Sequence, residues 1–263
     1  MTKVKICGIT NFQDASEACM LGADFLGFNF YKNSKRKVSL KMAADIISKL
    51  PPVFSPVGIF VDEEMAVIAQ SAKKCNLKLV QLHGRETPEY CTELVAKLQP
   101  LGVKIIKAFR VKGEGTLGYI ARFKDIADYF LLDAYVEGEP GGTGVAMNTP
   151  LPQTVEDAQP AAENAAENPQ DVSQDALELQ DNTSSEETET GVKPAVSGWD
   201  IAIEAKRYNK PIFLAGGLTP ENVEEAIEKV LPFAVDVASG VERLRRRKDY
   251  EKVKKFITSS KAF

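Results

Sequence analysis

The amino-acid sequence predicts a (β/α)8 barrel, and three observations support this prediction. Short apolar runs alternate with segments of helical spacing eight times along the 263 residues. Most runs are apolar throughout, as expected for parallel strands that are covered on both faces. The first run ends in Cys7-Gly8-Ile9, which is not the glycine-rich fingerprint of an open doubly wound sheet, so that fold is the weaker alternative.

Each expected strand is a short, mainly apolar run, and each expected helix has helical spacing of its apolar residues. The strands are expected at residues 4–7, 25–30, 55–61, 79–83, 104–111, 129–133, 211–215 and 234–239. The helices are expected at residues 11–21, 40–50, 63–75, 87–98, 117–126, 199–208, 221–230 and 250–260. Pro51-Pro52 ends the second helix, and Thr87-Pro88 supplies a cap and a first-turn proline to the fourth. Eight such units close a barrel.

One stretch departs from this alternation. Residues 149–197 are rich in Ala, Pro, Gln, Asn, Ser, Thr and acids, and burial of so few large apolar residues cannot offset the entropy of ordering them. Eleven acids against one lysine give this stretch a charge of −10, which leaves +6 for the rest because the whole chain carries −4. We therefore expect one barrel domain over residues 1–263 with a disordered acidic insertion at 149–197, in the loop after the sixth strand. Its ends, near Asn148 and Gly198, should lie close together.

The composition argues against several classes of function. The four cysteines show neither disulfide-type nor metal-type spacing, so we expect reduced thiols, no metal and a cytoplasmic location. We expect no membrane partner, because no apolar run has the length of a membrane span and the N-terminus lacks a signal-peptide pattern. Since no basic stripe is interleaved with aromatic residues, we also expect no nucleic-acid partner. The mildly basic body suits a small anionic substrate.

The strongest candidate residues stand at strand ends, where barrels place their active sites. Cys7 ends the first strand and shares a strand face with Lys5, whose ammonium favours the thiolate, a form able to take a proton from carbon. Asp133 ends an apolar strand with no helix directly after it, so it could donate a proton across the barrel mouth. The alternatives are an inert buried thiol and an ion-paired carboxylate. Because buried charges must be paired, Lys5 should also meet Asp236 of the last strand.

Four further places could bind an anionic substrate. Arg36 lies in a polar loop after the second strand and could form a fork around a carboxylate, although most such arginines are simply solvated. Gly216-Gly217 and Ser239-Gly240 follow the last two strands, where barrels commonly bind a phosphate through backbone N–H groups. A turn is the simpler explanation of a glycine pair. His83, the single histidine, ends the fourth strand; a packed strand-end residue is the more common case, so it ranks below Cys7 and Asp133 as a candidate.

Taken together, the motifs resemble those of the phosphoribosylanthranilate isomerase family of tryptophan biosynthesis. The resemblance covers nearly the whole chain outside the insertion and keeps the family's order of motifs. The motifs are Lys5-Ile6-Cys7-Gly8-Ile9-Thr10, Gly22-Ala23-Asp24 with Gly27-Phe28, Ser34-Lys35-Arg36, Val80-Gln81-Leu82-His83-Gly84, Leu131-Leu132-Asp133, Gly141-Gly142-Thr143-Gly144, Ala215-Gly216-Gly217-Leu218 and Val235-Asp236-Val237-Ala238-Ser239-Gly240-Val241-Glu242.

The resemblance implies an Amadori rearrangement of N-(5′-phosphoribosyl)anthranilate without metal or cofactor. The residue that matches Asp133 would be the general acid that opens the ribose ring, and the one that matches Cys7 the general base at C2. Arg36 would hold the anthranilate carboxylate, and the glycine and serine turns the phosphate. The expected partner is thus a phosphorylated small molecule, and the chain itself should be a monomer or homodimer.

Two departures from the family pattern and two rival functions accompany this expectation. The family usually carries Pro-Gly ahead of Lys-Asp after the eighth strand, whereas residues 243–249 read Arg-Leu-Arg-Arg-Arg-Lys-Asp. The acidic insertion also interrupts the sixth loop, which in the family closes over the substrate.

One rival is a related sugar-phosphate barrel that closes the indole ring, but that chemistry is expected to need a lysine acid and a glutamate where Cys7 and Asp133 stand. The other rival is a barrel scaffold whose acidic segment binds a basic partner.

Overall fold

A computed structural model describes residues 1–134, 147–148 and 196–262 of the chain. Its first eight strands form a closed barrel in chain order, with every neighbouring pair parallel. They are β1 (Lys3–Cys7), β2 (Phe25–Asn29), β3 (Ser55–Phe60), β4 (Leu79–Leu82), β5 (Lys104–Val111), β6 (Tyr129–Ala134), β7 (Ile212–Leu214) and β8 (Ala234–Val237). The predicted (β/α)8 barrel is therefore confirmed.

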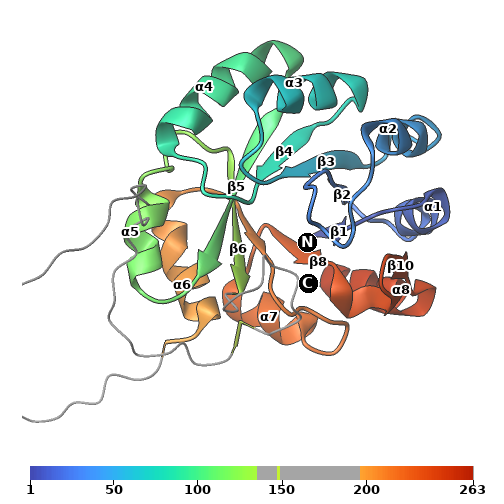
Figure 1. Ribbon diagram of the computed structural model, residues 1–263. Coiled ribbons are helices and arrows are strands. Elements are labelled where there is room, and N and C mark those ends of the chain that lie inside the picture. The colour runs from blue at the N-terminus through green and yellow to red at the C-terminus, as the bar shows by residue number, and fades with distance from the viewer. Residues whose placement is uncertain (135–146, 149–195, 263) are drawn as a thin grey trace, which may run out of the picture.

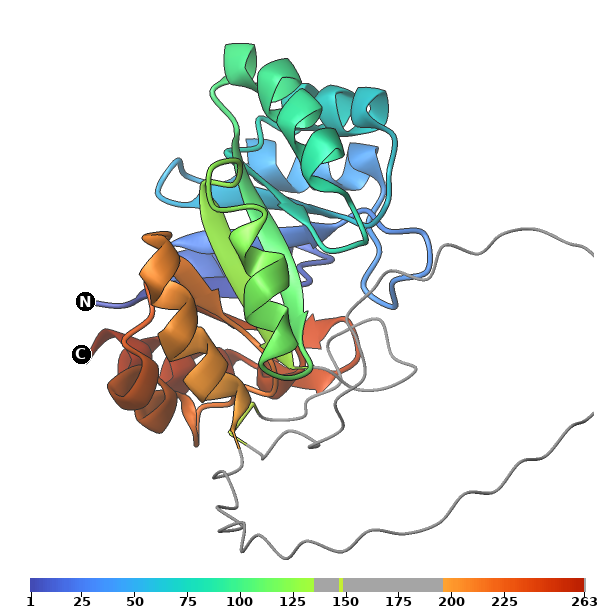
Figure 2. The same cartoon turned by 90° about the vertical axis from the view of Figure 1, so that its left-hand side faces the viewer.

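Eight α-helices of the described residues surround these strands (Figure 1). They are α1 (Phe12–Met20), α2 (Leu40–Ser48), α3 (Met65–Lys74), α4 (Pro88–Leu98), α5 (Gly115–Ala121), α6 (Gly198–Ala205), α7 (Val223–Val230) and α8 (Tyr250–Lys261), with short 3-10 turns η1 (Gln99–Leu101), η2 (Lys206–Tyr208) and η3 (Ser239–Val241). None of the helices in the described part of the chain is long and apolar enough to cross a membrane. The start of β1 and the end of α8 lie side by side at one end of the barrel (Figure 2).

Local signals set most helix starts. Asn11, Ser39, Thr87 and Asp249 are N-cap residues whose side chains accept a backbone N–H of the first turn. Ser197 forms a full capping box with Asp200 at the start of α6. Ser197, the last residue of the expected insertion, is thus the cap of α6, and the extent of the insertion stays a prediction.

The helix predicted at residues 117–126 has different boundaries in the structure. Helix α5 ends at Ala121, and the chain continues in tighter turns in which Phe123 N–H donates to Ile120 O at 3.0 Å and Ile126 N–H to Phe123 O at 3.1 Å. These turns leave Phe123 fully buried. Tertiary packing of this ring thus overrides the helical spacing of the sequence.

The barrel interior is built in layers. At the base, Phe25 of β2 and Phe213 of β7 meet edge to face with ring centroids 5.1 Å apart, and Tyr129 and Phe233 close the aromatic cluster. Above this apolar base lies a polar layer, since Lys5 of β1 bonds to side chains of both β4 and β8. Strands β1 and β4 are not neighbours, so such a contact can form only through the barrel interior.

A small hairpin follows β8 and was not predicted. Strands β9 (Glu242–Leu244) and β10 (Arg247–Lys248) pair antiparallel, with Arg247 opposite Leu244. Four arginines in seven residues give no alternation of apolar and polar side chains, so the usual sequence signal of a hairpin is missing.

The two edges of the interrupted sixth loop lie together. A Cβ atom placed on Gly198 would come within 3.1 Å of the carbonyl oxygen of Met147, and Met147 is itself 3% exposed. The expected closeness of the two ends is therefore confirmed at Met147 and Gly198. Residues 135–146 and 149–195 lie outside the described residues, so the expected disorder of the insertion stays a prediction.

Candidate active site

Cys7 ends β1 at the barrel mouth and is half-buried, whereas the other three cysteines are buried. The Lys5 ammonium, two residues back on the same face of β1, interacts electrostatically with its sulfur. Burial raises the pKa of the Cys7 thiol above its usual value, although Lys5, Lys248 and Arg36 each act to lower it. The expected contribution of Lys5 is present, but the expected thiolate-favouring outcome is wrong because desolvation outweighs it.

The predicted pair of Lys5 and Asp236 is confirmed. Lys5 is fully buried, and its Nζ lies 3.0 Å from Oδ1 of Asp236, its register partner on β8. Burial raises the pKa of Asp236 above the usual carboxyl value, against the opposing effect of the Lys5 ammonium. The pair therefore places a charged, fully enclosed group directly beneath Cys7.

Asp133 lies near the mouth end of β6 and is 6% exposed. Its Oδ2 lies 3.5 Å from Nε2 of His83, and Asp236 interacts electrostatically with both residues. Nδ1 of His83 lies 2.9 Å from the side-chain nitrogen of Gln81, which lies on β4. The structure thus brings Asp133 and His83 together at the barrel mouth.

Arg36 does not stand free in its loop. Its Nε and Nη2 donate to the two carboxylate oxygens of Glu242 at 2.7 and 2.8 Å, so the fork expected for a substrate carboxylate is already engaged. Gly8 makes this approach possible, because a Cβ atom there would lie 2.4 Å from Cδ of Arg36 and its φ is +77°. The guanidinium is held in a fixed place beside the loop that follows Cys7.

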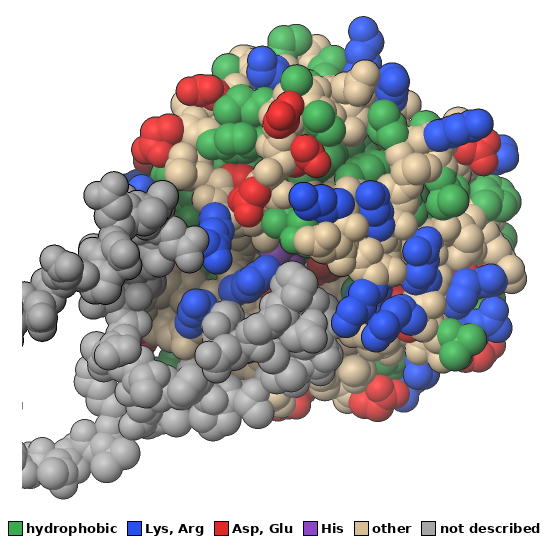
Figure 3. Space-filling model, in the orientation of Figure 1, with side chains coloured by type: hydrophobic (Ala, Val, Ile, Leu, Met, Phe, Trp, Pro, Cys, Tyr) green, Lys and Arg blue, Asp and Glu red, His purple; other side chains and the backbone are tan. Residues whose placement is uncertain are grey.

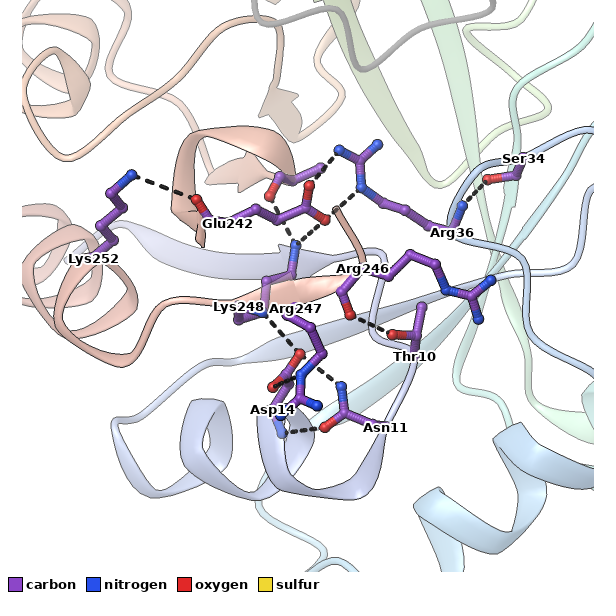
Figure 4. Close-up of polar contacts among 11 residues, drawn as sticks. Thr10, Asn11, Asp14, Ser34, Arg36, Glu242, Arg246, Arg247, Lys248 and Lys252 are labelled. Atoms are coloured by element: carbon purple, nitrogen blue, oxygen red, sulfur yellow. Dashed lines mark hydrogen bonds and ion pairs between the residues drawn. The ribbon is translucent and has the colours of Figure 1, made fainter. Parts of the chain in front are cut away.

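The hairpin beside Arg36 is fastened to the loop after β1 (Figure 4). Thr10 donates its hydroxyl to the carbonyl of Arg246 at 2.7 Å, and the backbone N–H of Lys248 donates to Oδ2 of Asp14 at 2.9 Å. Lys248 also places its buried Nζ 3.6 Å from Glu242 and 2.8 Å from the carbonyl of Ala238. Hydrogen bonds and ion pairs therefore join the segments that follow β1, β2 and β8 on this side of the mouth.

The two glycine turns lie against each other. A Cβ atom on Gly240 would come within 2.0 Å of the carbonyl oxygen of Leu218, the residue after Gly216-Gly217. Within the described residues, neither N–H of Gly216-Gly217 donates to a backbone carbonyl, and Ser239 and Gly240 stand in the first turn of η3. Asn222 braces the first turn by donating to the carbonyl of Gly217 at 3.0 Å. Side by side, such turns can present several N–H groups to one anion.

The hollow on this face is basic. Figure 3 shows Lys and Arg side chains gathered around it, with the single histidine of the chain visible inside. In the described residues, no group of three or more His, Cys, Asp and Glu side chains could hold a metal ion.

Comparison with known proteins places the chain in a family. A family model described as N-(5′phosphoribosyl)anthranilate (PRA) isomerase matches residues 4–194 and 163–259. The N-(5′-phosphoribosyl)anthranilate isomerase of Trichlorobacter lovleyi is 40% identical over 99% of this chain and 98% of its own length. The chain belongs to the PRA isomerase family. It is an enzyme of the isomerase class, as the motifs predicted, and the corresponding isomerase of Geobacter sulfurreducens is 38% identical with full coverage of both chains.

Solved PRA isomerases share the fold. The isomerase from Thermotoga maritima matches with a TM-score of 0.73 at 32% identity and covers 100% of both chains. A PRA isomerase in complex with reduced 1-(o-carboxyphenylamino)-1-deoxyribulose 5-phosphate matches with a TM-score of 0.71 at 30% identity, also over 100% of both chains. Monomers generated from the dimeric isomerase of T. maritima match with a TM-score of 0.70. The oligomeric state of the present chain stays a prediction.

Two residues that contact the candidate site were not singled out from the sequence. Gln81 is a polar residue in the otherwise apolar strand β4 and faces the same side as His83, which was the available signal. Glu242 is the partner of Arg36 across 206 residues of sequence, and no local pattern could connect the two.

Proposed function

We propose that this chain converts N-(5′-phosphoribosyl)anthranilate to 1-(2-carboxyphenylamino)-1-deoxyribulose 5-phosphate in L-tryptophan biosynthesis, with Asp133 as general acid and Cys7 as general base. One observation carries the proposal. Cys7 ends β1 and Asp133 lies next to the end of β6, and both interact with the same buried Lys5–Asp236 pair, so a proton donor and a proton acceptor share one mouth. Family membership supplies the reaction.

The rearrangement needs one acid step and one base step. Asp133 protonates the ring oxygen of the ribose, the C1–O bond breaks, and the nitrogen lone pair forms a C1=N iminium. Cys7 as thiolate then removes the proton from C2, and the electrons of the C–H bond move to give an enolamine. The enolamine becomes the ketone by tautomerisation, so hydrogen moves within the substrate and no external oxidant or reductant takes part.

The raised pKa of Cys7 bears directly on the base step. Burial favours the neutral thiol before substrate enters, while Lys5 stabilises the thiolate that the reaction requires. A base of raised pKa is also a stronger base, which suits removal of a proton from carbon. The proposed role therefore needs Lys5 as the fixed counter-charge of the thiolate.

Residues around the mouth would bind the two charged ends of the substrate, its phosphate and its carboxylate. The N–H groups of Gly216, Gly217, Ser239 and Gly240 would hold the phosphate. Arg36 would meet the anthranilate carboxylate with the N–H groups that Glu242 leaves free, and His83 would line the mouth beside Asp133. The two sites would hold the substrate across the Cys7 and Asp133 side chains.

The test is steady-state turnover followed by the loss of anthranilate-type substrate fluorescence. Cys7→Ser and Asp133→Asn should each lower kcat on the order of 10²-fold or more while KM changes little, because both groups act as protons move. Cys19→Ser is the matched control, since Cys19 is a buried thiol on α1 outside the mouth. A variant at Cys7 or Asp133 with near-normal kcat would remove that residue from its proposed role. Stoichiometric binding of the substrate without turnover by the wild-type protein would instead favour a scaffold.

A further inference from the structure

The polar layer of the barrel contains a chain of side chains that runs from below Cys7 to Asp133. Lys5 donates from Nζ to Oε1 of Gln81 at 2.9 Å, in addition to its bond with Asp236. Gln81 is 1% exposed, so these are enclosed contacts without competing water at its surface. The chain continues from Gln81 to His83 and ends 3.5 Å from Asp133.

The ammonium of Lys5 decides which way the Gln81 amide points. An ammonium group can only donate, so the amide atom that faces Lys5 must be the oxygen. The amide nitrogen of Gln81 then faces Nδ1 of His83 at 2.9 Å. An amide nitrogen also only donates, and Nδ1 must therefore be the acceptor, without a hydrogen of its own.

The hydrogen of a neutral imidazole that accepts at Nδ1 sits on Nε2. Nε2 of His83 is buried, has no hydrogen-bond partner among the described residues, and faces Oδ2 of Asp133 at 3.5 Å. This distance is longer than a good hydrogen bond, and contacts of this kind shorten when substrate fills an active site. Each hydrogen bond in this series of side chains thus has a defined donor, from the ammonium of Lys5 to the carboxyl group of Asp133.

We propose that Gln81 is a positioning residue, which transmits the fixed charge of Lys5 to hold His83 as the neutral Nε2–H tautomer aimed at Asp133. The inference rests on the proposed role of Asp133 as general acid. A carboxylic acid whose Oδ2 accepts from Nε2–H carries its own proton on Oδ1, so the proton to be transferred has one defined place. Lys5 then serves both reacting groups, since it faces the thiol of Cys7 directly and orients Asp133 through Gln81 and His83.

The tautomer can be measured without any activity. His83 is the single histidine of the chain, so ring-labelled ¹⁵N-histidine gives one pair of nitrogen resonances in the whole protein. We expect the Nδ1 signal of an unprotonated nitrogen and the Nε2 signal of a protonated one at neutral pH. A protonated Nδ1, an averaged mixture of tautomers or an imidazolium at neutral pH would each overturn the inference.

Substitution of Gln81 tests the direction of hydrogen-bond donation from Lys5 to His83. A carboxylate at this position can only accept, so Gln81→Glu should move the hydrogen of His83 to Nδ1 or produce the imidazolium, and it should lower kcat about 10-fold or more with KM within a few-fold. Gln81→Leu removes the donor and should give mixed tautomers with a smaller loss of kcat. Gln70→Glu makes the same charge change on the exposed face of α3 and should alter neither the resonances nor kcat.

The outcomes separate this inference from the proposed function. If Gln81→Glu changes the tautomer but leaves kcat unchanged, positioning by Gln81 is wrong while the roles of Cys7 and Asp133 still stand on their own variants. If the tautomer is as expected but Asp133→Asn keeps near-normal kcat, the general acid is wrong and the hydrogen-bond direction is not. Should Gln81→Glu fail to fold, the wild-type resonances and Gln81→Leu decide the question alone.

Discussion

Replacement of Lys5 by methionine should destabilise the protein strongly, because it leaves the carboxylate of Asp236 enclosed without its cation. Removing one partner of a buried ion pair lowers the free energy of unfolding by about 3–5 kcal/mol. Lys5 is fully buried and its Nζ lies 3.0 Å from Asp236, so little water can replace the lost charge. With a urea dependence of about 2–3 kcal/mol per molar for a domain of this size, the unfolding midpoint should fall by roughly 1–2 M.

The cost should depend on pH with a definite sign. Burial already raises the pKa of Asp236, so the folded state binds a proton more readily than the unfolded state. The folded state therefore loses stability as pH rises from the ordinary carboxyl pKa of the unfolded chain to the raised pKa of the folded one. Removal of Lys5 takes away the cation that opposes this shift. The penalty of Lys5→Met should therefore be small near pH 4 and grow toward pH 8, and adding Asp236→Asn should remove most of the growth.

The assay is equilibrium urea unfolding at several pH values, with Lys3→Met as the matched control. Lys3 lies on the same strand and meets Asp24 at 3.3 Å, but its side chain is 46% exposed. Such a surface pair is worth less than about 1 kcal/mol, so the control should shift the midpoint little at any pH. If Lys5→Met costs no more than Lys3→Met, or costs the same at pH 4 and pH 8, the account of the buried pair is wrong.

Four further predictions follow from the site and its walls. Alkylation of Cys7 by iodoacetamide should accelerate with pH through a midpoint above that of an ordinary thiol, and Lys5→Met should raise this midpoint further; an unchanged titration curve would contradict the contribution of Lys5. Arg36→Met should raise KM roughly 10-fold or more with little change in kcat, and a pure kcat effect in the same kinetic assay would contradict carboxylate binding. Arg246 has a φ of 71°, so Arg246→Gly should raise the melting temperature by about 2–4 °C in calorimetry, and a lowered value would show that its side chain matters more than its backbone. Replacing residues 149–195 by a short glycine-serine link should leave folding and kcat within a few-fold, with any difference shrinking as salt rises; loss of folding would make the segment structural.

The sequence was sufficient for the barrel because each strand and helix carries its own local signal. The pair of Lys5 and Asp236 could also be predicted, since the first and last strands of a closed barrel are neighbours and both residues interrupt apolar runs. Closeness of the two ends of the insertion could be predicted as well, because they join a strand end to the helix packed behind it. These features depend on strand order and periodicity, which the sequence contains.

Other features depend on contacts that no local pattern encodes. Glu242 engages Arg36 from a loop at the far end of the chain, so the expected open fork could not be judged before the two loops were placed. The pKa of Cys7 is decided by enclosure within the mouth, which outweighs the neighbouring ammonium that the sequence reveals. The hydrogen bonds from Lys5 through Gln81 to His83 could not be predicted without knowing that β4 faces β1 across the barrel interior.

The adjacency of Met147 and Gly198 has a practical consequence for rearranging the chain. The entropic cost of closing a loop grows only slowly with its length, so a long segment can leave and re-enter a fold at neighbouring points at little cost to stability. The start of β1 and the end of α8 also lie side by side (Figure 1). The polypeptide could therefore be circularly permuted, with its old ends joined and new ends opened within the sixth loop, and all eight strands would keep their neighbours.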